Sequence, residues 1–578
     1  MKAEESMSIH ACPNAPQILF DQAARPDLKQ IPRFMVPVGD EFVPVTWAQF
    51  AERVEHIAAF LIEHGIDRDI KAAVLSNTRI EWGIAGLAIG AARGVLVPVY
   101  PTLFGEQLAH ILAHSDSKLV FVENAEQLAR VLSVWDRLDI QTLVTMDDVD
   151  VHRAAQEAGL DPDPIVASTF GFARAEQAGQ TQLAAQPQQV RERLAQIAAE
   201  DVSSLLYTSG TTGMPKGVLL SYHNLAVNGG DWISVNGPLL QEGDVDVLWL
   251  PMSHIYGWGQ FCLGNQLGFL TYFSSPPKAF EHLMNLSPHL FMSVPAYWEK
   301  LAQIAQAASN EPQQQYAELK RITGGRLRFC LSGGAGLRRE VKEFFKAAGI
   351  MIIEGYGLTE CSPTLTMNRI DDFDFSSVGK AFPSVRLKLA EDGEILAKGE
   401  NVFVGYHKDP QATNAMFDAE GWLKTGDLGR FNERGFLQII GRKKDILVTA
   451  GGKNIPPENI ELLFREDPLI AHLVVYGDGK HYLTALVDIN DQVAQARLDE
   501  MGVTSDSAAR RHPKVHQWIS ELIDAVNQSL PRHETIKNFC IADEPLTMEG
   551  GMLTPSLKIK RRQVYERYRS ELEALYHS

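Results

Sequence analysis

The sequence predicts an α/β protein with a large N-terminal domain of parallel-sheet α/β subdomains plus a β-rich subdomain, and a small α+β C-terminal domain. From Asp69 onward, short β-branched runs alternate with segments of helix length. These strands lack polar alternation, which is typical of parallel strands that helices cover on both faces. From Arg386 the pattern changes to short strands between glycine turns, which predicts the β-rich subdomain, and strand–helix alternation returns after Gly441.

The first run of alternating segments predicts strands at 72–76, 94–100 and 118–123, with helices at 81–93 and 108–114 between them. The stretch that follows, 177–200, is rich in Gln and Ala. This composition fits either a helical excursion over the surface or a linker, and both interpretations stay open.

Further strands are expected at 203–207, 245–250, 327–331 and 351–354, and each runs into a turn that contains Gly, Ser or Pro. In open parallel sheets, ligands bind beyond the carboxyl ends of the strands. We therefore expect the functional residues to lie in these turns.

The chain after Gly441 predicts the small domain. Its expected elements are 455–465, 472–476, 482–487 and a helix near 515–529. The 442–445 segment is the expected boundary, which divides the chain into a large domain, 1–443, and a small domain, 444–578.

Composition and charge exclude several classes of protein. Hydrophobic residues make up 45% of the chain and charged residues 22%, which is the range of ordinary globular proteins. The 54 basic and 72 acidic side chains give a net charge of −18, which opposes non-specific attraction to nucleic acid or anionic lipid. We therefore expect no nucleic acid partner.

Cysteine use and hydropathy predict a cytoplasmic protein. The five cysteines are odd in number and form no CxxC pair, which argues against a disulfide framework and a zinc site. The first twenty residues contain no apolar run long enough for a signal peptide. The apolar 85–100 stretch is interrupted by Arg93 and Pro98, so any membrane association would be peripheral.

A phosphate-binding loop is predicted at 205–217, which reads LLYTSGTTGMPKG. After a hydrophobic strand come hydroxyl-bearing and glycine residues that can surround phosphate oxygens, and then a cation. It is not a Walker A loop, because Pro215 precedes Lys216 and no GK[ST] ending is present. The residues concerned are Thr208, Ser209, Gly210, Thr211, Thr212, Gly213 and Lys216.

Four more motifs follow this loop in order. They are SGGA at 332–335, GYGLTE at 355–360, TGD at 425–427 and GRKKD at 441–445. A last motif, LTPSLKIKRR, spans 553–562. Over roughly residues 40 to 570, the chain resembles the adenylate-forming superfamily, which includes acyl-CoA synthetases, firefly luciferase and nonribosomal-peptide adenylation domains.

The resemblance implies a nucleotide site. The turn with Gly333, Gly334 and Ala335 would bind adenine, and Tyr356 in the Tyr356–Gly357 pair would stack on it. Thr359 would meet the α-phosphate, while Glu360 and Thr208 would hold Mg²⁺. Asp427 would accept hydrogen bonds from the ribose hydroxyls, a task that suits the two oxygens of a carboxylate. Arg442 would contact the nucleotide.

The resemblance also implies how the small domain takes part. Lys444 sits where the family has its hinge, and Lys558 matches the lysine that enters the adenylation site. Many members have Gly before that lysine, whereas this chain has Leu557, so Lys560 stays open as the alternative. The turn with Gly451 and Gly452 would admit the narrow pantetheine arm of CoA after the small domain has rotated.

The implied reaction needs no Ser/His/Asp set, because the substrate carboxylate itself attacks the α-phosphorus of ATP and expels pyrophosphate. Positive potential from Lys558, Mg²⁺ and the loop amides would stabilise the charge that builds up. A thiol of CoA would then displace AMP.

The segments 45–50 and 77–100 and the PMSH loop ending at His254 resemble the long-chain fatty acid branch, so the implied substrates are a fatty acid, ATP and CoA. Tyr256 and Trp258 would line the mouth of an acyl tunnel, or belong to the core. Alternatives are a fatty acyl-AMP ligase that loads a carrier protein, and a non-catalytic nucleotide-binding regulator. The short 361–378 connection disfavours the first, and retention of Lys558 and Glu360 disfavours the second. A homodimer stays open.

Overall fold

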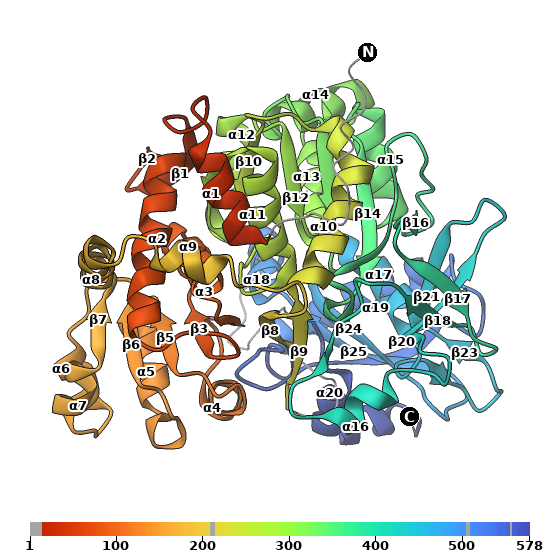
Figure 1. The fold of residues 1–578 in the computed structure, drawn as a ribbon. Helices are drawn as coiled ribbons and strands as arrows, with labels where there is room; N and C mark the ends of the chain where they lie inside the picture. The colour runs from red at the N-terminus through yellow and green to blue at the C-terminus, as the bar shows by residue number, and fades with distance from the viewer. Residues whose placement is uncertain (1–13, 209–213, 504–508, 555–557, 578) are drawn as a thin grey trace, which may run out of the picture.

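The computed structural model describes residues 14–208, 214–503, 509–554 and 558–577, and five sheets organise this part of the chain. Figure 1 shows two large sheets in the red to green part of the molecule and a smaller part in blue. Among the helices that are described, none combines the length and the apolarity needed to cross a bilayer.

An eight-stranded sheet carries the first third of the chain, in the order β19-β9-β8-β4-β3-β5-β6-β7. Strands β8 to β7 in this order are parallel, and β9 and β19 add an antiparallel edge. The strands are β3 (Lys71–Leu75), β4 (Val95–Val99), β5 (Leu119–Val122), β6 (Thr142–Thr145), β7 (Thr169–Gly171), β8 (Val202–Thr208), β9 (Lys216–Ser221) and β19 (Gly405–Tyr406). The helices are α2 (Trp47–Glu63), α3 (Ile80–Ala91), α4 (Gly105–His114), α5 (Ala125–Leu132), α6 (Val151–Glu157), α7 (Pro162–Ala167), α8 (Phe172–Ala185) and α9 (Gln189–Leu194).

Helices cover both faces of this sheet, as the lack of polar alternation predicts. Ala72 and Val74 of β3 belong to a core with α2 and α3, whereas Ala73 and Leu75 belong to a core with α4 and α5. The first core also contains Phe273, which lies on the second large sheet. The two sheets are therefore joined through one continuous apolar core.

The second large sheet has nine strands in the order β16-β15-β14-β13-β12-β10-β11-β1-β2. Its middle, from β14 to β1, is parallel, and both edges are antiparallel. The strands are β1 (Pro32–Val38), β2 (Glu41–Thr46), β10 (Val245–Leu248), β11 (Leu270–Phe273), β12 (Leu290–Ser293), β13 (Phe329–Ser332), β14 (Ile352–Gly357), β15 (Thr364–Met367) and β16 (Lys380–Ala381). The helices are α1 (Ala15–Ala24), α10 (Tyr222–Asn236), α11 (Ile255–Leu267), α12 (Ala279–Leu286), α13 (Pro295–Ala307), α14 (Pro312–Ile322) and α15 (Arg339–Ala347).

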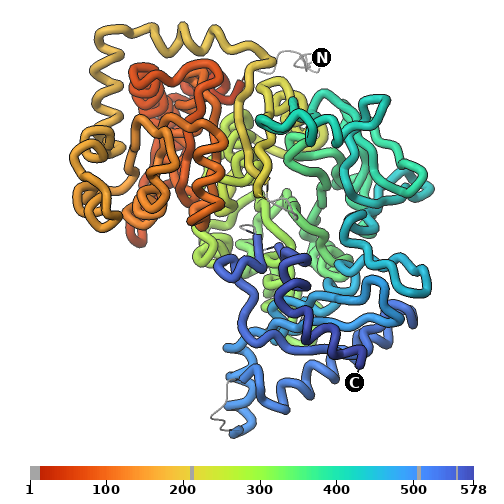
Figure 2. Tube along the Cα trace, turned by 90° about the horizontal axis from the view of Figure 1, so that it is seen from below, coloured from red at the N-terminus to blue at the C-terminus, as the bar shows by residue number. Residues whose placement is uncertain are grey.

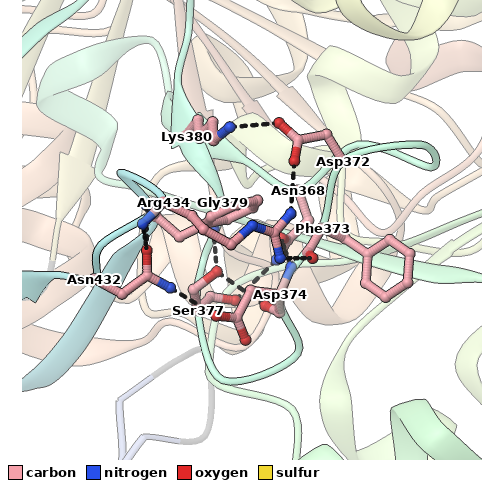
Figure 3. A network of polar contacts seen from close by, with 10 residues as sticks. Asn368, Asp372, Phe373, Asp374, Ser377, Gly379, Lys380, Asn432 and Arg434 are labelled. Atoms are coloured by element: carbon pink, nitrogen blue, oxygen red, sulfur yellow. Dashed lines mark hydrogen bonds and ion pairs between the residues drawn. The ribbon is translucent and has the colours of Figure 1, made fainter.

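The β-rich subdomain is an antiparallel sheet of β17 (Arg386–Leu389), β18 (Glu394–Lys398), β20 (Leu423–Phe431) and β21 (Leu437–Arg442), with α16 (Pro410–Ala415) nearby. A polar network ties this sheet to the connection between β15 and β16 (Figure 3). Asp372 pairs with Lys380 at 2.6 Å and with Arg434 at 3.0 Å, and Asn432 donates to Asp374 over 2.7 Å. The β-rich subdomain is thereby held against the second large sheet.

The C-terminal part has its own apolar core, because two clusters of buried side chains consist only of residues from Leu447 onward. Its strands are β22 (Leu447–Val448), β23 (Asn454–Ile455), β24 (Ile470–Tyr476), β25 (Leu483–Ile489) and β26 (Ile536–Ile541). Its helices are α17 (Pro457–Leu462), α18 (Asp491–Glu500), α19 (Pro513–Asn527), α20 (Arg561–Arg567) and α21 (Arg569–Ala574). Seen from below, this blue part lies against the larger one (Figure 2).

The expected strands and helices are confirmed, with boundaries shifted by a few residues. The Gln- and Ala-rich stretch belongs to helices α8 and α9, so of the two interpretations the helical one is confirmed. No counterpart in the expectations exists for strands β1, β2, β6, β7, β9, β11, β12, β15, β16, β22 and β26. β12 has only four residues, all buried and without alternation, and such a run cannot be told from part of a buried helix.

The close packing of α8 on α2 gives the first testable prediction. A Cβ added to Gly179 would lie 1.7 Å from the carbonyl oxygen of His56, so Gly179→Ala must push two helix backbones apart. We expect it to destabilise the protein by about 1 to 3 kcal/mol, the usual cost of overpacking, and to lower the melting temperature. Gly171→Ala, at the start of the same helix, has no atom within 4 Å of the new Cβ and is the matched control. Equal melting temperatures for the two variants would contradict the packing described.

Candidate active site

The predicted site residues gather where strands of both large sheets end. Thr208 is the last residue of β8, the glycine turn at Gly333 follows β13, and Tyr356 lies in β14. His254 comes after β10, at the start of α11. The loop residues Ser209, Gly210, Thr211, Thr212 and Gly213 lie outside the described residues.

The carboxylate of Asp427 lies at the centre of this group. The hydroxyl of Tyr356 donates to Oδ2 of Asp427 over 2.7 Å, and Nε of Arg442 lies 2.9 Å from Oδ1. Burial raises the pKa of Tyr356, and the neighbouring Asp427 raises it further. Burial alone would lower the pKa of Arg442, but Asp427 together with the smaller effects of Tyr356, Glu458 and Asp445 outweighs it, and the pKa is raised. The phenol therefore stays neutral and the guanidinium charged, with the carboxylate held between them.

Glu360 and Lys216 meet at Tyr406. Glu360 is buried in the short helical turn Thr359–Cys361, and its Oε1 accepts a hydrogen bond of 2.7 Å from the hydroxyl of Tyr406. The ammonium of Lys216 lies 5.0 Å from the centre of the Tyr406 ring, within the range of a cation–π contact. Tyr406 thus connects the phosphate loop to the GYGLTE motif.

The oxygen donors here fit a magnesium ion. Among the described residues no cluster of three His, Cys, Asp or Glu side chains could hold a metal by itself. Mg²⁺ is commonly held by one or two carboxylates together with substrate phosphates, rather than by an all-protein cage. Glu360 is a carboxylate of that kind, and Thr208 as its partner in holding the ion stays a prediction.

His254 and Tyr256 begin α11. Nδ1 of His254 accepts a hydrogen bond of 3.1 Å from the backbone N–H of Tyr256, so the neutral ring carries its proton on Nε2. Burial, and then the charge of Lys558, lower the pKa of His254 to about 4. The ring of Tyr256 lies against Gly333, where an added Cβ would be 3.2 Å from it. A larger residue at 333 would displace the tyrosine.

Lys558 reaches this group from the C-terminal part. Its side chain has solvent-exposed surface, yet protein atoms surround it closely enough that desolvation, followed by the charge of Arg442, lowers its pKa. Asp427 acts in the opposite direction. Burial also lowers the pKa of Lys560, and there burial by itself accounts for the shift. Lys558 thus lies near Arg442 and His254, and its assignment over Lys560 stays a prediction.

Glu394 is a residue that the motifs did not reveal. Its Oε1 accepts from the backbone N–H of Gly426 over 3.0 Å, and its Oε2 accepts from the ammonium of Lys443 over 2.8 Å. It therefore fixes the TGD turn and the start of the domain boundary. For Glu394 and Tyr406 alike, the contacts that matter join residues more than thirty positions apart, and the only local signal was a polar side chain beside a glycine.

The remaining predicted residues lie farther along the chain. Burial, and then Arg442, lower the pKa of Lys444. Gly451 and Gly452 form the turn between β22 and β23, and Gly452 has the left-handed φ of +72°. Nothing in these contacts tests the thiol path or the hinge, which stay predictions.

Trp258 is packed among aromatic side chains. It is 7% exposed, and its ring lies 5.2 Å from that of Trp82 and 5.3 Å from that of Phe261. Gly86 of α3 lets it approach, because an added Cβ would lie 3.0 Å from the Trp258 ring. Trp258 belongs to the shared core, and a role in an acyl tunnel stays a prediction.

Comparison with known proteins agrees with this geometry. A family model described as "AMP-binding enzyme" matches residues 20–407, and one described as "AMP-binding enzyme C-terminal domain" matches residues 444–578. The chain belongs to the AMP-binding enzyme family. The expected resemblance to the adenylate-forming superfamily is thereby confirmed.

Relatives in this family match most of the length of the chain. A protein of Mycobacterium bovis named long-chain-fatty-acid–CoA ligase FadD15 is 31% identical, with 92% of each chain covered. A human protein named long-chain-fatty-acid–CoA ligase ACSBG2 is 27% identical, with 93% of this chain and 89% of the human one covered.

Solved structures share the fold. The A-PCP didomain of the carboxylic acid reductase of Segniliparus rugosus, in complex with AMP, superposes with a TM-score of 0.77 at 21% identity, covering 98% of this chain and 82% of that one. The anthranilate CoA ligase AuaEII, in complex with anthranoyl-AMP, gives 0.75 at 19% identity, with 98% and 99% covered.

The carboxylate of Asp427, which contacts both Tyr356 and Arg442, gives a testable prediction about AMP binding. Asp427→Ala should weaken AMP binding about a hundredfold, because it removes two charge-assisted contacts and leaves Arg442 without its partner, whereas Tyr356→Phe should cost about fivefold. Calorimetric titration with AMP measures both. Tyr316→Phe on α14 is the control for loss of a hydroxyl. A loss for Tyr356→Phe as large as that for Asp427→Ala would show that Asp427 is not the shared centre.

Proposed function

We propose that this protein activates a long-chain fatty acid with ATP, forms an acyl-AMP intermediate, and transfers the acyl group to CoA with release of AMP. The observation that carries the proposal is the meeting of Lys558 with Arg442, Asp427 and His254, because it brings a cation of the C-terminal part to a ribose-binding carboxylate. The relatives named as long-chain-fatty-acid–CoA ligases support the substrate class.

In the first step, a carboxylate oxygen of the fatty acid forms a bond to the α-phosphorus of ATP, and the bond to the β-phosphate oxygen breaks to release pyrophosphate. Asp427 binds the ribose hydroxyls and Tyr356 stacks on the adenine, which fixes the direction of attack. The ammonium groups of Lys216 and Lys558 offset the charge of the two approaching anions. Mg²⁺, bound through Glu360 and Thr208, would neutralise phosphate charge.

His254 contributes as a neutral donor. Because its pKa is lowered to about 4, the imidazole carries no charge at neutral pH, and its Nε2–H is free of the contact that Nδ1 makes with Tyr256. A neutral N–H can donate to a carboxylate or phosphate oxygen without taking its proton. We assign it the role of orienting the fatty acid carboxylate.

In the second step, the CoA thiol attacks the acyl carbonyl carbon, a C–S bond forms, and the C–O bond to AMP breaks while the thiol proton leaves to solvent. The small domain, beginning at Lys444, would rotate so that Lys558 withdraws and the turn with Gly451 and Gly452 approaches. Their lack of side chains leaves a path for the pantetheine arm.

Fatty acids and CoA are favoured over other partners on two grounds. Trp258 and Phe261 pack in the aromatic core and lie on α11, whose first residues lie in the site, so an apolar tail has apolar surface nearby. The connection between β15 and β16 is short and is held by Asp372 and Asp374 against the β-rich subdomain (Figure 3), which leaves no long insertion there to restrain the small domain.

The test is pyrophosphate release by the purified protein with ATP and saturated fatty acids from short to long chains, with CoA present or withheld. We expect release that depends on long acids, and acyl-CoA as product when CoA is added. Acyl-AMP that accumulates with CoA present and is discharged only by a carrier protein would instead indicate the acyl-AMP ligase. No acid-dependent release would contradict catalysis altogether.

The position of Lys558 gives a second prediction. Lys558→Ala should slow acyl-AMP formation about 10² to 10³-fold, because one preorganised charge is lost, while conversion of supplied acyl-AMP to acyl-CoA should remain close to that of the unchanged protein. Single-turnover measurement of each half-reaction separates the two. Lys560→Ala is the matched control, two residues away. A larger defect for Lys560→Ala would move the assignment to Lys560.

A further inference from the structure

A cluster of three histidines and a tyrosine lies at the base of the phosphate loop, and the reaction described above makes no use of it. His110 and His114 come from α4, His407 follows β19, and Tyr207 precedes Thr208 on β8. The ring centres of His110 and His114 are 5.0 Å apart, and those of His114 and His407 are 5.3 Å apart. The group is compact and draws on three elements: helix α4, strand β8 and the end of β19.

Both arms of the loop are bonded to this cluster. On the outgoing arm, a hydrogen bond of 2.8 Å joins the hydroxyl of Tyr207 to Nδ1 of His114. On the returning arm, Nε2 of His110 donates to the carbonyl oxygen of Pro215 over 3.0 Å. Pro215 directly precedes Lys216, and Thr208 pairs with Lys216 across β8 and β9.

The returning arm is also packed without free space. The backbone N–H of His407 donates to the carbonyl of Gly217 over 2.8 Å. A Cβ added to Gly217 would lie 2.7 Å from Leu205, 3.2 Å from the Tyr207 ring and 3.3 Å from His407. The stem therefore has little freedom to shift relative to the cluster.

Burial and neighbouring charges favour the neutral form of the His114 and His407 rings. Burial, and then His110 and Lys408, lower the pKa of His114, while Asp116 and Asp409 oppose them. Burial, and then Lys71, His114 and Lys408, lower the pKa of His407 to about 4, against Asp116. At neutral pH these two rings add no positive charge. His114 therefore acts through its hydrogen bond to Tyr207 rather than by attracting phosphate.

We propose that His110 and His114 are positioning residues that hold the two arms of the loop stem, and with them Thr208 and Lys216, at the separation required by the polyphosphate of ATP. The inference rests on the proposed function in that it takes ATP as the ligand. Neither ring is assigned a contact with the nucleotide. His110 acts through the Pro215 carbonyl, and His114 acts through Tyr207.

The two histidines use different ring nitrogens, which allows a selective test. The amide nitrogen of Gln can replace Nε2, and the amide of Asn can replace Nδ1. His110→Gln and His114→Asn should therefore retain the bonds, whereas His110→Asn, His114→Gln and the two alanine variants should lose them. His152→Ala, at an exposed position on α6, is the control for loss of a histidine.

The measurement is calorimetric titration of each variant with magnesium-ATP and, separately, with AMP, alongside thermal melting. We expect variants that lose a bond to bind ATP about tenfold more weakly, the usual worth of one hydrogen bond, with AMP binding changed less than twofold. The retaining variants and His152→Ala should match the unchanged protein.

Three results would overturn the proposal: equal losses for ATP and AMP, Gln and Asn variants that behave alike at both positions, or ATP binding that is normal in the alanine variants. These results are separate from failure of the proposed function. If the unchanged protein releases no pyrophosphate with any fatty acid, the proposed reaction fails, while the ATP-over-AMP comparison still decides the role of the stem.

Discussion

The two hydrogen-bonded oxygens of Asp427 hold the site together. One oxygen binds Tyr356 of the nine-stranded sheet, and the other binds Arg442 at the last position of the β-rich sheet. The region that matches the C-terminal family model begins at residue 444, just after Arg442, so the carboxylate holds the chain beside the start of that region. Lys558, at the far end of the small domain, lies close enough to Arg442 and Asp427 for their charges to alter its pKa.

Charges of both signs surround this carboxylate, because Arg442, Lys444 and Lys558 lie near Asp445, Glu458 and Glu360 as well. Arg442 lowers the pKa of both Lys444 and Lys558, which means that the three cations repel one another while burial removes their solvent. A nucleotide polyphosphate would relieve both effects. We therefore expect relief of this repulsion to contribute to the free energy of nucleotide binding.

The fold and the linear motifs were predictable from the sequence, whereas the contacts that orient them were not. The residues of a motif such as GYGLTE are adjacent in the sequence, so the motif can be recognised without knowledge of the fold. Tyr406 lies 46 residues from Glu360, and His110 lies 105 residues from Pro215. Such pairs arise from strand order and helix placement, which local periodicity does not specify. The same limit explains β12, whose four residues carry no helix or strand signature.

Helix α11 joins the polar and apolar ends of the proposed substrate. Its first residue is preceded by His254, whose uncharged ring lies near Lys558. Its second residue, Tyr256, packs against the glycine turn at Gly333. Farther along, Trp258 and Phe261 enter the core, where α3 provides glycine at the points of contact. A shift of α11 would therefore move the His254 ring and the packed aromatic residues together. Because the interior is close-packed, the acyl end and the nucleotide end cannot adjust independently.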